Sequence, residues 1–273
     1  MEQTVNVNQT IDNNSTNKIR VIELFGGIGA FTAAMKRLGI PHDVVDYVEI
    51  DKYAVKSYNA INGTNFEPQD ICQWDKDVYA DVIMHGSPCT DFSIAGRQEG
   101  GDEGSGTRSS LMYETLRIVE KIKPKFVIWE NVKNVLSPKH IHNFKNYKNR
   151  LSELGYESYY QVLNAKNYGI PQNRERIFCI SIRKDIDKGF EFPEPFELKL
   201  RLKDILEDKV DEKYYLSESA LNGLIERKQR NEDRGVGFGF VPKSENEIAN
   251  NLETKRGRNT DTYLVDNDGG GTK

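Results

Sequence analysis

The sequence has few cysteines, and this scarcity narrows the classes of protein to which it can belong. Its 273 residues include three, Cys72, Cys89 and Cys179, with no two in a C-x-x-C pair. An odd number of widely separated thiols argues against both a disulfide framework and a structural zinc site, and it fits a reducing intracellular compartment. We therefore predict a cytoplasmic protein.

Long apolar runs and targeting segments are missing as well. No stretch approaches the roughly 18–20 uninterrupted apolar residues that span a bilayer, so no membrane association is predicted. Residues 1–18, MEQTVNVNQTIDNNSTNK, are polar and rich in Asn and Thr, and they lack the basic and apolar regions of a signal peptide. They predict a disordered N-terminal tail.

A strong charge of one sign is also lacking. The 38 Lys and Arg residues nearly balance 42 Asp and Glu residues, which gives a formal net charge of −4. This argues against a surface coated in basic patches, but it does not exclude nucleic acid, because binding depends on where the charge lies. His140 and His142 have no further ligand residues beside them, so they predict no metal site and are expected to face solvent or a phosphate.

What the sequence does contain is a regular alternation of strand-like and helix-like segments. Strands are predicted at residues 20–25, 43–51, 81–87, 123–132 and 176–184, and helices at 31–39, 53–61, 109–123 and 146–155. Such alternation is typical of an α/β protein with an open, mostly parallel sheet and helices on both faces. After residue 187 the chain becomes richer in Pro, Gly and charge, so we predict a first domain at 19–187 and a second region at 188–273.

Polar motifs stand at the carboxyl ends of four predicted strands. These motifs are Gly26–Gly27, Glu49, Pro88–Cys89 and Glu130–Asn131. Ligands of open α/β sheets bind beyond the carboxyl ends of the strands, so the common placement of the four motifs predicts one composite site.

The first two of these motifs predict a place for a cofactor. The glycine turn Gly26–Gly29 opens a helix, and Glu49 follows about twenty residues later, where an acid can accept hydrogen bonds from ribose hydroxyls. Thr32 stands where a dinucleotide fingerprint requires its third glycine, which favours S-adenosylmethionine over a dinucleotide. Asp70–Ile71 offers an acceptor for the adenine amino group. The alternative is a plain tight turn without a ligand.

Cys89 differs from the other two cysteines because it follows a Ser-Pro pair on a loop of small and polar residues. Cys72 and Cys179 are predicted to be buried packing residues, as free cysteines usually are. A thiol on a loop beside cationic partners can act as a nucleophile. Candidate partners elsewhere in the chain are Glu130, Arg174 and Arg176. The alternative for these charged residues is a surface ion pair without a catalytic role.

Taken as a set, the motifs resemble those of one enzyme family. FGGIGAF (25–31), VEID (48–51), QDI (69–71), GSPCTDFS (86–93), ENV (130–132) and QNRERIF (172–178) follow the order and rough spacing of the C5-cytosine DNA methyltransferases. The resemblance extends over residues 19–185. It implies a Rossmann-like, S-adenosylmethionine-dependent methyltransferase fold, with a partial target-recognition region at 188–273.

The resemblance also implies an activity and a setting. The chain is expected to transfer a methyl group from S-adenosyl-L-methionine to carbon 5 of cytosine in double-stranded DNA, with S-adenosyl-L-homocysteine as the product. The setting is a bacterial cell, or a phage gene expressed within one, and restriction-modification is the expected context. No metal is implied.

Individual roles follow from the same resemblance. Cys89 is expected to be the nucleophile, Glu130 the acid that contacts the base, and Arg176 the cation that steadies it, with Arg174 beside it. The implied cofactor contacts are Phe25, Gly27, Ile28, Gly29, Glu49, Ile50, Asp70, Ile71, Pro88 and Leu111. The chain departs from the family in one detail: many members follow the cysteine with glutamine, where this chain has Thr90–Asp91.

Two other classes of function stay open on sequence grounds. A nucleotide-dependent oxidoreductase or a small-molecule methyltransferase would use the same sheet without Cys89 or DNA. The second class is a silent DNA-binding relative or one half of a split enzyme. The family adds a further helix and a final segment after its recognition region, and nothing after Thr254 resembles either. The 273 residues are then expected to be either a truncated chain or the larger partner of a split enzyme, which needs a separate C-terminal subunit or fragment for activity.

Overall fold

The computed structural model describes most of the chain between Lys18 and Asn250. The described residues are 18–89, 92, 101–208, 210, 211, 213, 215–235 and 240–250. The predicted tail up to residue 17, the Thr90–Asp91 pair and everything after Asn250 lie outside them. The chain forms two compact units, each of which is described by itself.

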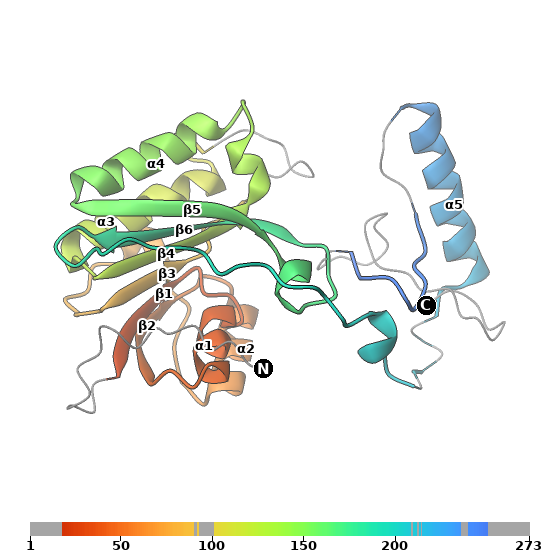
Figure 1. Ribbon diagram of the computed structural model, residues 1–273, viewed down its shortest axis with the longest axis horizontal. Coiled ribbons are helices and arrows are strands. Elements are labelled where there is room, and N and C mark those ends of the chain that lie inside the picture. The colour runs from red at the N-terminus through yellow and green to blue at the C-terminus, as the bar shows by residue number, and fades with distance from the viewer. Residues whose placement is uncertain are drawn as a thin grey trace. The chain divides into compact units, whose positions relative to one another are not determined.

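The first unit comprises the described residues of Met1–Val162 together with Arg176–Pro193, and it is built on a six-stranded sheet (Figure 1). Its strands are β1 (Ile19–Leu24), β2 (His42–Val48), β3 (Val82–His85), β4 (Phe126–Val132), β5 (Tyr156–Asn164) and β6 (Glu175–Arg183). They lie in the order β2-β1-β3-β4-β6-β5. The pairs β1–β2, β1–β3 and β3–β4 are parallel, and β4–β6 is antiparallel. The predicted mostly parallel sheet is confirmed.

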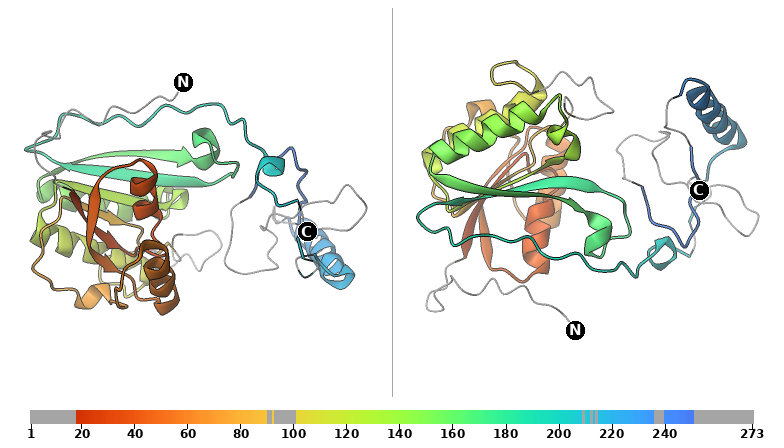
Figure 2. Two further views of the ribbon diagram at one scale, coloured as in Figure 1. Left: turned by 90° about the horizontal axis from the view of Figure 1, so that it is seen from below. Right: turned by 45° about the horizontal axis from the view of Figure 1, so that its top comes forward.

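Helices cover both faces of this sheet. Figures 1 and 2 show α1 (Ala30–Arg37) and α2 (Lys52–Asn62) on one face, and α3 (Met112–Ile122) and α4 (Ile141–Glu153) on the other. The strand order reverses at β1, because the chain steps outward to β2 and then returns to β3 on the opposite side. In sheets of this kind, ligands bind at the carboxyl ends of the strands beside that reversal.

Short-range signals set the ends of the helices. The Asp51 side chain caps α2 by accepting hydrogen bonds from the N–H groups of Tyr53 (2.7 Å) and Ala54 (3.2 Å). Gly63 ends the same helix in the left-handed conformation, with φ of 68°. α4 begins at Ile141, ahead of the predicted start at residue 146.

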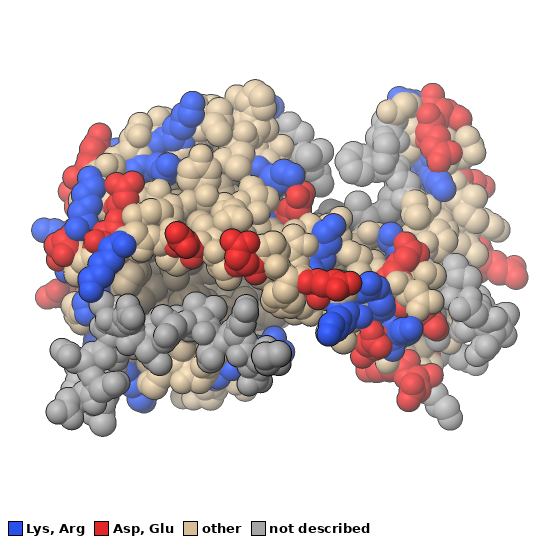
Figure 3. Space-filling view, in the orientation of Figure 1, with Lys and Arg blue, Asp and Glu red and all other residues tan. Residues whose placement is uncertain are grey.

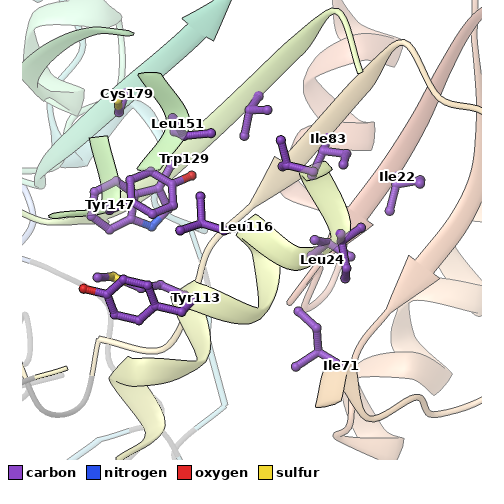
Figure 4. Close-up of a cluster of buried hydrophobic side chains, with 14 of the residues drawn as sticks. Ile22, Leu24, Ile71, Ile83, Tyr113, Leu116, Trp129, Tyr147, Leu151 and Cys179 are labelled. Atoms are coloured by element: carbon purple, nitrogen blue, oxygen red, sulfur yellow. The ribbon is translucent and has the colours of Figure 1, made fainter. Parts of the chain in front are cut away.

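The main hydrophobic core includes residues of the sheet and of α3 and α4 (Figure 4). Trp129 of β4 is fully buried, and its ring lies 5.6 Å from that of Phe144 and 5.0 Å from that of Tyr147, centroid to centroid. Ile83 and Leu116 pack in the same cluster. Burying each such side chain stabilises the fold by about 1.5–3 kcal/mol, so this core holds β3 and β4 in place.

Burial decides three of the predictions made for single residues. Cys179 is buried in the main core, which confirms its packing role, whereas Cys72 is exposed and its predicted burial is wrong. Cys72 lies in a single-turn helix, and its side chain does not reach the core. The prediction that His140 faces solvent is also wrong, because it is 1% exposed and packs edge-on against Phe92, with ring centroids 5.4 Å apart.

Two elements were not predicted. β5 is an edge strand with mostly half-buried or exposed residues, so it shows no alternation of apolar and polar side chains. α5 (Glu218–Asp233) has Leu224 as its one buried residue and therefore lacks an apolar stripe. Within the described residues, every helix is too short or too polar to cross a bilayer.

The second unit comprises Leu163–Glu175 and the described residues of Glu194–Lys273, including α5. Its segments are joined by backbone hydrogen bonds, such as that from Leu202 N–H to the Glu247 carbonyl (3.0 Å). A cavity of about 400 Å³ lies in this unit, and its lining includes Lys166, Phe196, Arg201, Lys243 and Glu247. Lys243 and Glu247 form an ion pair with each other (3.2 Å).

A buried histidine ends β3, directly before the cysteine loop. His85 Nε2 lies 2.7 Å from the Tyr147 hydroxyl, and Nδ1 lies 3.4 Å from the Thr115 hydroxyl. Burial lowers the pKa of His85 to about 3 and raises the pKa of Tyr147 well above its ordinary value. Both groups are therefore neutral in the folded protein near neutral pH, and they form a neutral hydrogen bond inside the core.

We expect His85 to make the free energy of unfolding fall between pH 7 and pH 5. Its pKa is about 3 when folded and 6.5 in the ordinary case, so below pH 6.5 the unfolded chain binds a proton that the folded chain does not. This loss approaches about 1.4 kcal/mol per pH unit. His85→Asn should show a smaller change in urea midpoint over this pH range than the wild type. An equal change in both proteins would contradict the assignment.

Candidate active site

The motifs at the carboxyl ends of four strands meet at one edge of the sheet. In the ladder, Leu24 pairs with both Val48 and His85, and His85 pairs with Trp129. Because these strands are parallel and pair in step at this end of the sheet, the next residue of each lies at the same level. Those next residues are Phe25, Glu49, Gly86 and Glu130.

Arg176 reaches the same edge because β6 runs antiparallel to β4. The first residues of β6 therefore lie beside the last residues of β4, where Arg176 pairs with Val132. The Arg176 Nε atom is 3.2 Å from Glu130 Oε1, and the two side chains are 18% and 26% exposed. Partial burial strengthens this attraction relative to that of a fully exposed ion pair.

Glu130 also lies beside the start of the cysteine loop. A Cβ placed on Gly86 would come 3.9 Å from Glu130 Oε2, so the carboxylate lies next to this glycine. Gly86 directly follows β3 and precedes Cys89 by three residues. The acid, the arginine and the first residues of the cysteine loop thus share one region.

Two buried side chains of β4 hold the cysteine loop at Ser87. The Trp129 indole N–H donates to Ser87 Oγ (2.9 Å), and the Asn131 amide donates to the Ser87 carbonyl (3.1 Å). Because side chains alternate along a strand, Glu130 between them faces the opposite way. Sequence reasoning missed Ser87, Trp129 and Asn131 as positioning residues. The available signal was the asparagine directly after Glu130.

Cys89 is half-buried, and hydrogen bonds hold the backbone on both sides of it. Ser87 is fixed before it, and after it the Cys89 carbonyl accepts a hydrogen bond from Phe92 N–H (3.1 Å). Phe92 is fully buried, and its own carbonyl accepts from the Asn134 side chain (2.5 Å). These contacts fix the backbone on which the thiol is carried.

The glycine turn lies over two stacked tyrosine rings. The ring centroids of Tyr47 and Tyr58 are 3.9 Å apart with an interplanar angle of 24°. A Cβ on Gly26 would lie 2.6 Å from the Tyr47 ring, and one on Gly29 would lie 2.7 Å from the Tyr58 ring. Gly27 differs, because its φ is 53° and nothing lies within 4 Å of its Cβ position. The turn is closed on the tyrosine side and leaves Gly27 open to the close approach of a ligand.

The Glu49 carboxylate joins this turn to the start of α2. Its Oε2 atom accepts from Gly27 N–H (3.1 Å), and its Oε1 atom accepts from Asp51 N–H (2.9 Å). Ile28 and Ile50, each next to one of these residues in the chain, are 62% and 68% exposed. An acid with two exposed apolar neighbours suits a ligand with hydroxyl groups and an apolar face.

The other predicted cofactor contacts are placed less directly. The Asp70 carboxylate caps a single-turn helix by accepting from Cys72 N–H (3.0 Å). Ile71 is 4% exposed, so its side chain serves mainly the core. The remaining three, Phe25, Pro88 and Leu111, are partly buried.

Arg174 belongs to the second unit, unlike Arg176. Its backbone N–H donates to the Asn164 side chain (3.1 Å), which lies in the same unit. Its catalytic role therefore stays a prediction. Among the residues that the structure describes, no group of three or more His, Cys, Asp or Glu side chains is arranged to hold a metal ion.

The fold and the site together define a class of protein. A mostly parallel sheet, with a glycine turn and an acid after β1 and β2 and a cysteine loop and acid–arginine pair beside β3 and β4, is a Rossmann-like fold of the methyltransferase type. Residues 19–268 match the family model described as C-5 cytosine-specific DNA methylase. The chain belongs to this family, and the resemblance noted in its sequence is confirmed.

Curated relatives come from bacteria and phages. The chain is 38% identical over 253 residues to the type II methyltransferase M.SsoII of Shigella sonnei, covering 89% of this chain and 64% of that protein. It is 36% identical over 241 residues to the orphan methyltransferase M.SPRI of Bacillus phage SPR, covering 76% of this chain and 54% of that protein. The chain therefore spans about half to two thirds of the length of these relatives.

Solved structures share the fold. The S. pombe Dnmt2 methyltransferase matches with a TM-score of 0.69 and 20% identity, covering 93% of this chain and 78% of that one. The Entamoeba histolytica methyltransferase EhMeth matches with a TM-score of 0.68 and 17% identity, covering 92% and 76%. At these identities the likeness shows the fold alone.

Gly29→Ala is expected to reduce the free energy of unfolding more than Gly27→Ala. Both residues have positive φ, which disfavours alanine by about 1–2 kcal/mol. Only at Gly29 does the new Cβ meet a ring, that of Tyr58 at 2.7 Å, so overpacking adds about 1–3 kcal/mol. Urea denaturation of the two variants measures the difference. Equal losses would contradict the packing of the tyrosine rings beneath the turn.

Proposed function

We propose that the chain is the catalytic and cofactor-binding part of a DNA (cytosine-5-)-methyltransferase. The proposed reaction transfers a methyl group from S-adenosyl-L-methionine to carbon 5 of cytosine in double-stranded DNA. One observation carries the proposal: Glu130 and Arg176 form a partly buried pair, 3.2 Å apart, at the sheet edge from which the Cys89 loop begins. Membership of the C-5 cytosine-specific DNA methylase family supports it.

The chemistry of cytosine explains why a thiol belongs at this position. The base is first extruded from the DNA stack, at a cost of a few kcal/mol. The Cys89 thiolate then forms a bond to carbon 6, and the electron pair of the 5,6 double bond becomes available at carbon 5. After methylation, a base removes the carbon-5 proton, the double bond re-forms, and the Cys89 sulfur leaves with its electron pair.

Glu130 and Arg176 assist the attack by Cys89 in this proposal. Glu130 takes up a proton from solvent as the base binds and then donates that proton or a hydrogen bond to N3 of the cytosine, which makes carbon 6 more electrophilic. Arg176 stabilises the negative charge that develops on the carbonyl oxygen. Their ion pair holds both side chains in one geometry before a base arrives. Arg174, two residues earlier in the chain, is proposed as a second cation.

The residues at the glycine turn fit S-adenosyl-L-methionine. Gly27 leaves space for close approach to the backbone, Glu49 provides acceptor oxygens for ribose hydroxyls, and Ile28 and Ile50 expose apolar surface beside them. The bound cofactor supplies the methyl group and leaves as S-adenosyl-L-homocysteine. The proposed site is completed by Phe25, Gly29, Asp70, Ile71, Pro88 and Leu111.

Double-stranded DNA is the proposed partner because of the reaction proposed for Cys89, Glu130 and Arg176, and not because of the net charge of the chain. On the face shown in Figure 3, Lys and Arg are interspersed with Asp and Glu. Specific contacts near Cys89 and Arg176, and in residues 188–273 as the proposed target-recognition region, are therefore expected to matter more than a broad basic surface. The bacterial and phage origin of the relatives supports action within a bacterial cell.

In the chain supplied with a C-terminal fragment of a family member and with S-adenosyl-L-methionine, Cys89→Ser is expected to abolish covalent trapping on DNA in which 5-fluorocytosine replaces cytosine. Fluorine at carbon 5 blocks the final removal of a proton, so a complete enzyme stays attached through the Cys89 sulfur. Full replacement of cytosine makes the test independent of the recognition sequence. A denaturing gel reports the adduct, and Cys179→Ser, in the buried core, is the matched control that should retain it. Equal trapping by Cys89→Ser would sink the assignment.

Glu49→Ala is expected to weaken the binding of S-adenosyl-L-methionine by about 1–3 kcal/mol. The change leaves buried hydroxyl groups without their charged acceptor. Isothermal titration calorimetry with S-adenosyl-L-homocysteine measures the effect without turnover. Asp43→Ala, at an exposed position on β2, the strand that directly precedes Glu49, is the control that should bind like the wild type. Unchanged affinity of Glu49→Ala would count against the proposed cofactor site.

We also propose that full activity needs a further polypeptide segment of the kind that accounts for the greater length of the relatives, whether it belongs to the same protein or to a separate subunit. The match to M.SsoII covers 64% of that protein. Ile28, Ile50 and Tyr53 are each more than 60% exposed around the glycine turn and the start of α2, and they offer apolar surface for such a segment.

The 273 residues alone are expected to bind S-adenosyl-L-methionine weakly and to methylate DNA negligibly, because catalysis is sensitive to misplacement of about 1 Å. A C-terminal fragment of a family member, added in trans, should restore the transfer of labelled methyl groups. The DNA sequence preference of the restored enzyme should then be set largely by residues 190–273 of this chain. Full, sequence-specific methylation by the purified 273 residues alone would show this proposal to be wrong.

A further inference from the structure

The backbone on either side of the Gly27 Cα is held by two different side chains. The Gly27 N–H donates to Glu49 Oε2 at 3.1 Å, and the Gly27 carbonyl accepts from the Tyr47 hydroxyl at 2.6 Å. Gly27 has a φ of 53° and no neighbour within 4 Å of its Cβ position. A glycine in open space has several accessible conformations, so these two hydrogen bonds select one of them.

Tyr47 is well placed to act as a fixed support. It lies on β2 two residues before Glu49, and its side chain is fully buried. Its ring stacks on Tyr58 (3.9 Å between centroids) and is tilted against Phe66 (5.5 Å). The ring also fills the space where a Cβ on Gly26 would lie, 2.6 Å away. Its hydroxyl therefore has little freedom to leave the Gly27 carbonyl.

The neighbouring Tyr58 makes a different use of its hydroxyl. The Tyr58 oxygen is 3.1 Å from Thr32 Oγ1, and the Thr32 hydroxyl donates to the buried Glu23 carboxyl. Tyr58 thus packs beneath the turn without a hydrogen bond to it among the described contacts. The two stacked tyrosines have similar burial and different partners, which makes them a matched pair for mutation.

Tyr47 is a protonated hydrogen-bond donor near neutral pH. Burial raises its pKa well above the ordinary range, and the nearby Glu49 carboxylate adds to the shift. Near neutral pH the phenol is therefore protonated, and it donates to the Gly27 carbonyl. Any contribution to function is therefore one of position.

We propose that Tyr47 is a positioning residue of the cofactor site, which fixes the Gly27 backbone so that Glu49 presents its carboxylate to the ribose. This inference rests on the proposed function for the identity of the ligand. Without the Tyr47 hydroxyl, the carbonyl side of Gly27 loses its hydrogen bond and the glycine samples other conformations. Its N–H then leaves Glu49 for part of the time, and the carboxylate loses its orientation.

Tyr47→Phe tests the proposal, since it removes one hydroxyl and keeps the stacked ring. Titration calorimetry with S-adenosyl-L-homocysteine should show a dissociation constant raised about 3- to 10-fold, the effect of one hydrogen bond. Tyr58→Phe, which removes the hydroxyl of the stacked partner, should change it less than about twofold. Equal weakening by the two variants, or none by Tyr47→Phe, would overturn the proposal.

A double-mutant cycle separates positioning from a general loss of structure. If Tyr47 acts through Glu49, Tyr47→Phe should change the dissociation constant little when Glu49 is already alanine. The same fold-change in both backgrounds would show that Tyr47 acts independently of Glu49 and would overturn the inference.

Amide hydrogen exchange provides a measurement that needs no ligand. In the free protein, Tyr47→Phe should speed exchange at Gly27 N–H about tenfold, while Tyr58→Phe should not. Unchanged exchange at Gly27 would overturn the inference even if ligand affinity fell. If Tyr47→Phe alone speeds exchange at Gly27 but the wild type does not bind S-adenosyl-L-homocysteine, the proposed cofactor is wrong. Tyr47 then only supports the conformation of the turn.

Discussion

The in-register hydrogen bonding of parallel strands is the constraint on which the rest of this structure depends. Val48 of β2, Leu24 of β1, His85 of β3 and Trp129 of β4 lie at one level, so the residues that follow them also lie at one level. A glycine turn, an acid, the start of the cysteine loop and a second acid are thereby brought to one edge of the sheet by the pairing of the strands. The antiparallel direction of β6 adds Arg176 to this edge, because its amino end lies beside the carboxyl end of β4.

At this edge, the chemical groups are oriented by buried or partly buried polar contacts. On β4, alternation sends Trp129 and Asn131 inward to hold Ser87, while Glu130 faces Arg176. At the other end of the edge, a tyrosine hydroxyl and a carboxylate hold the backbone around a single glycine. Breaking these hydrogen bonds costs more where the groups are buried, because an unpaired polar group away from water is destabilising. The groups that face the proposed site are therefore held in place by the residues packed behind them.

Much of this arrangement could be predicted from the sequence, for identifiable reasons. Buried strands such as β3 are short apolar runs bounded by turn signals, and Glu49 stands at a strand end at a distance from the glycine turn that fits a ribose-binding acid. β5 and α5 could not be predicted, because an edge strand and a helix with one buried residue carry no apolar period. Tyr47 was missed because its partner, the Gly27 carbonyl, is 20 residues earlier in the chain. The exposure of Cys72 was missed because sequence cannot show which side of a single turn meets the core.

We propose above all that the glycine turn after β1 and Glu49 after β2 form the cofactor site. A crystal structure of the protein with S-adenosyl-L-homocysteine tests it most directly. The account predicts the ribose hydroxyls within hydrogen-bonding distance of Glu49, and the ligand against the open face of Gly27 between Ile28 and Ile50. A ligand bound in the cavity beside Phe196 and Arg201, or with its ribose away from Glu49, would contradict it.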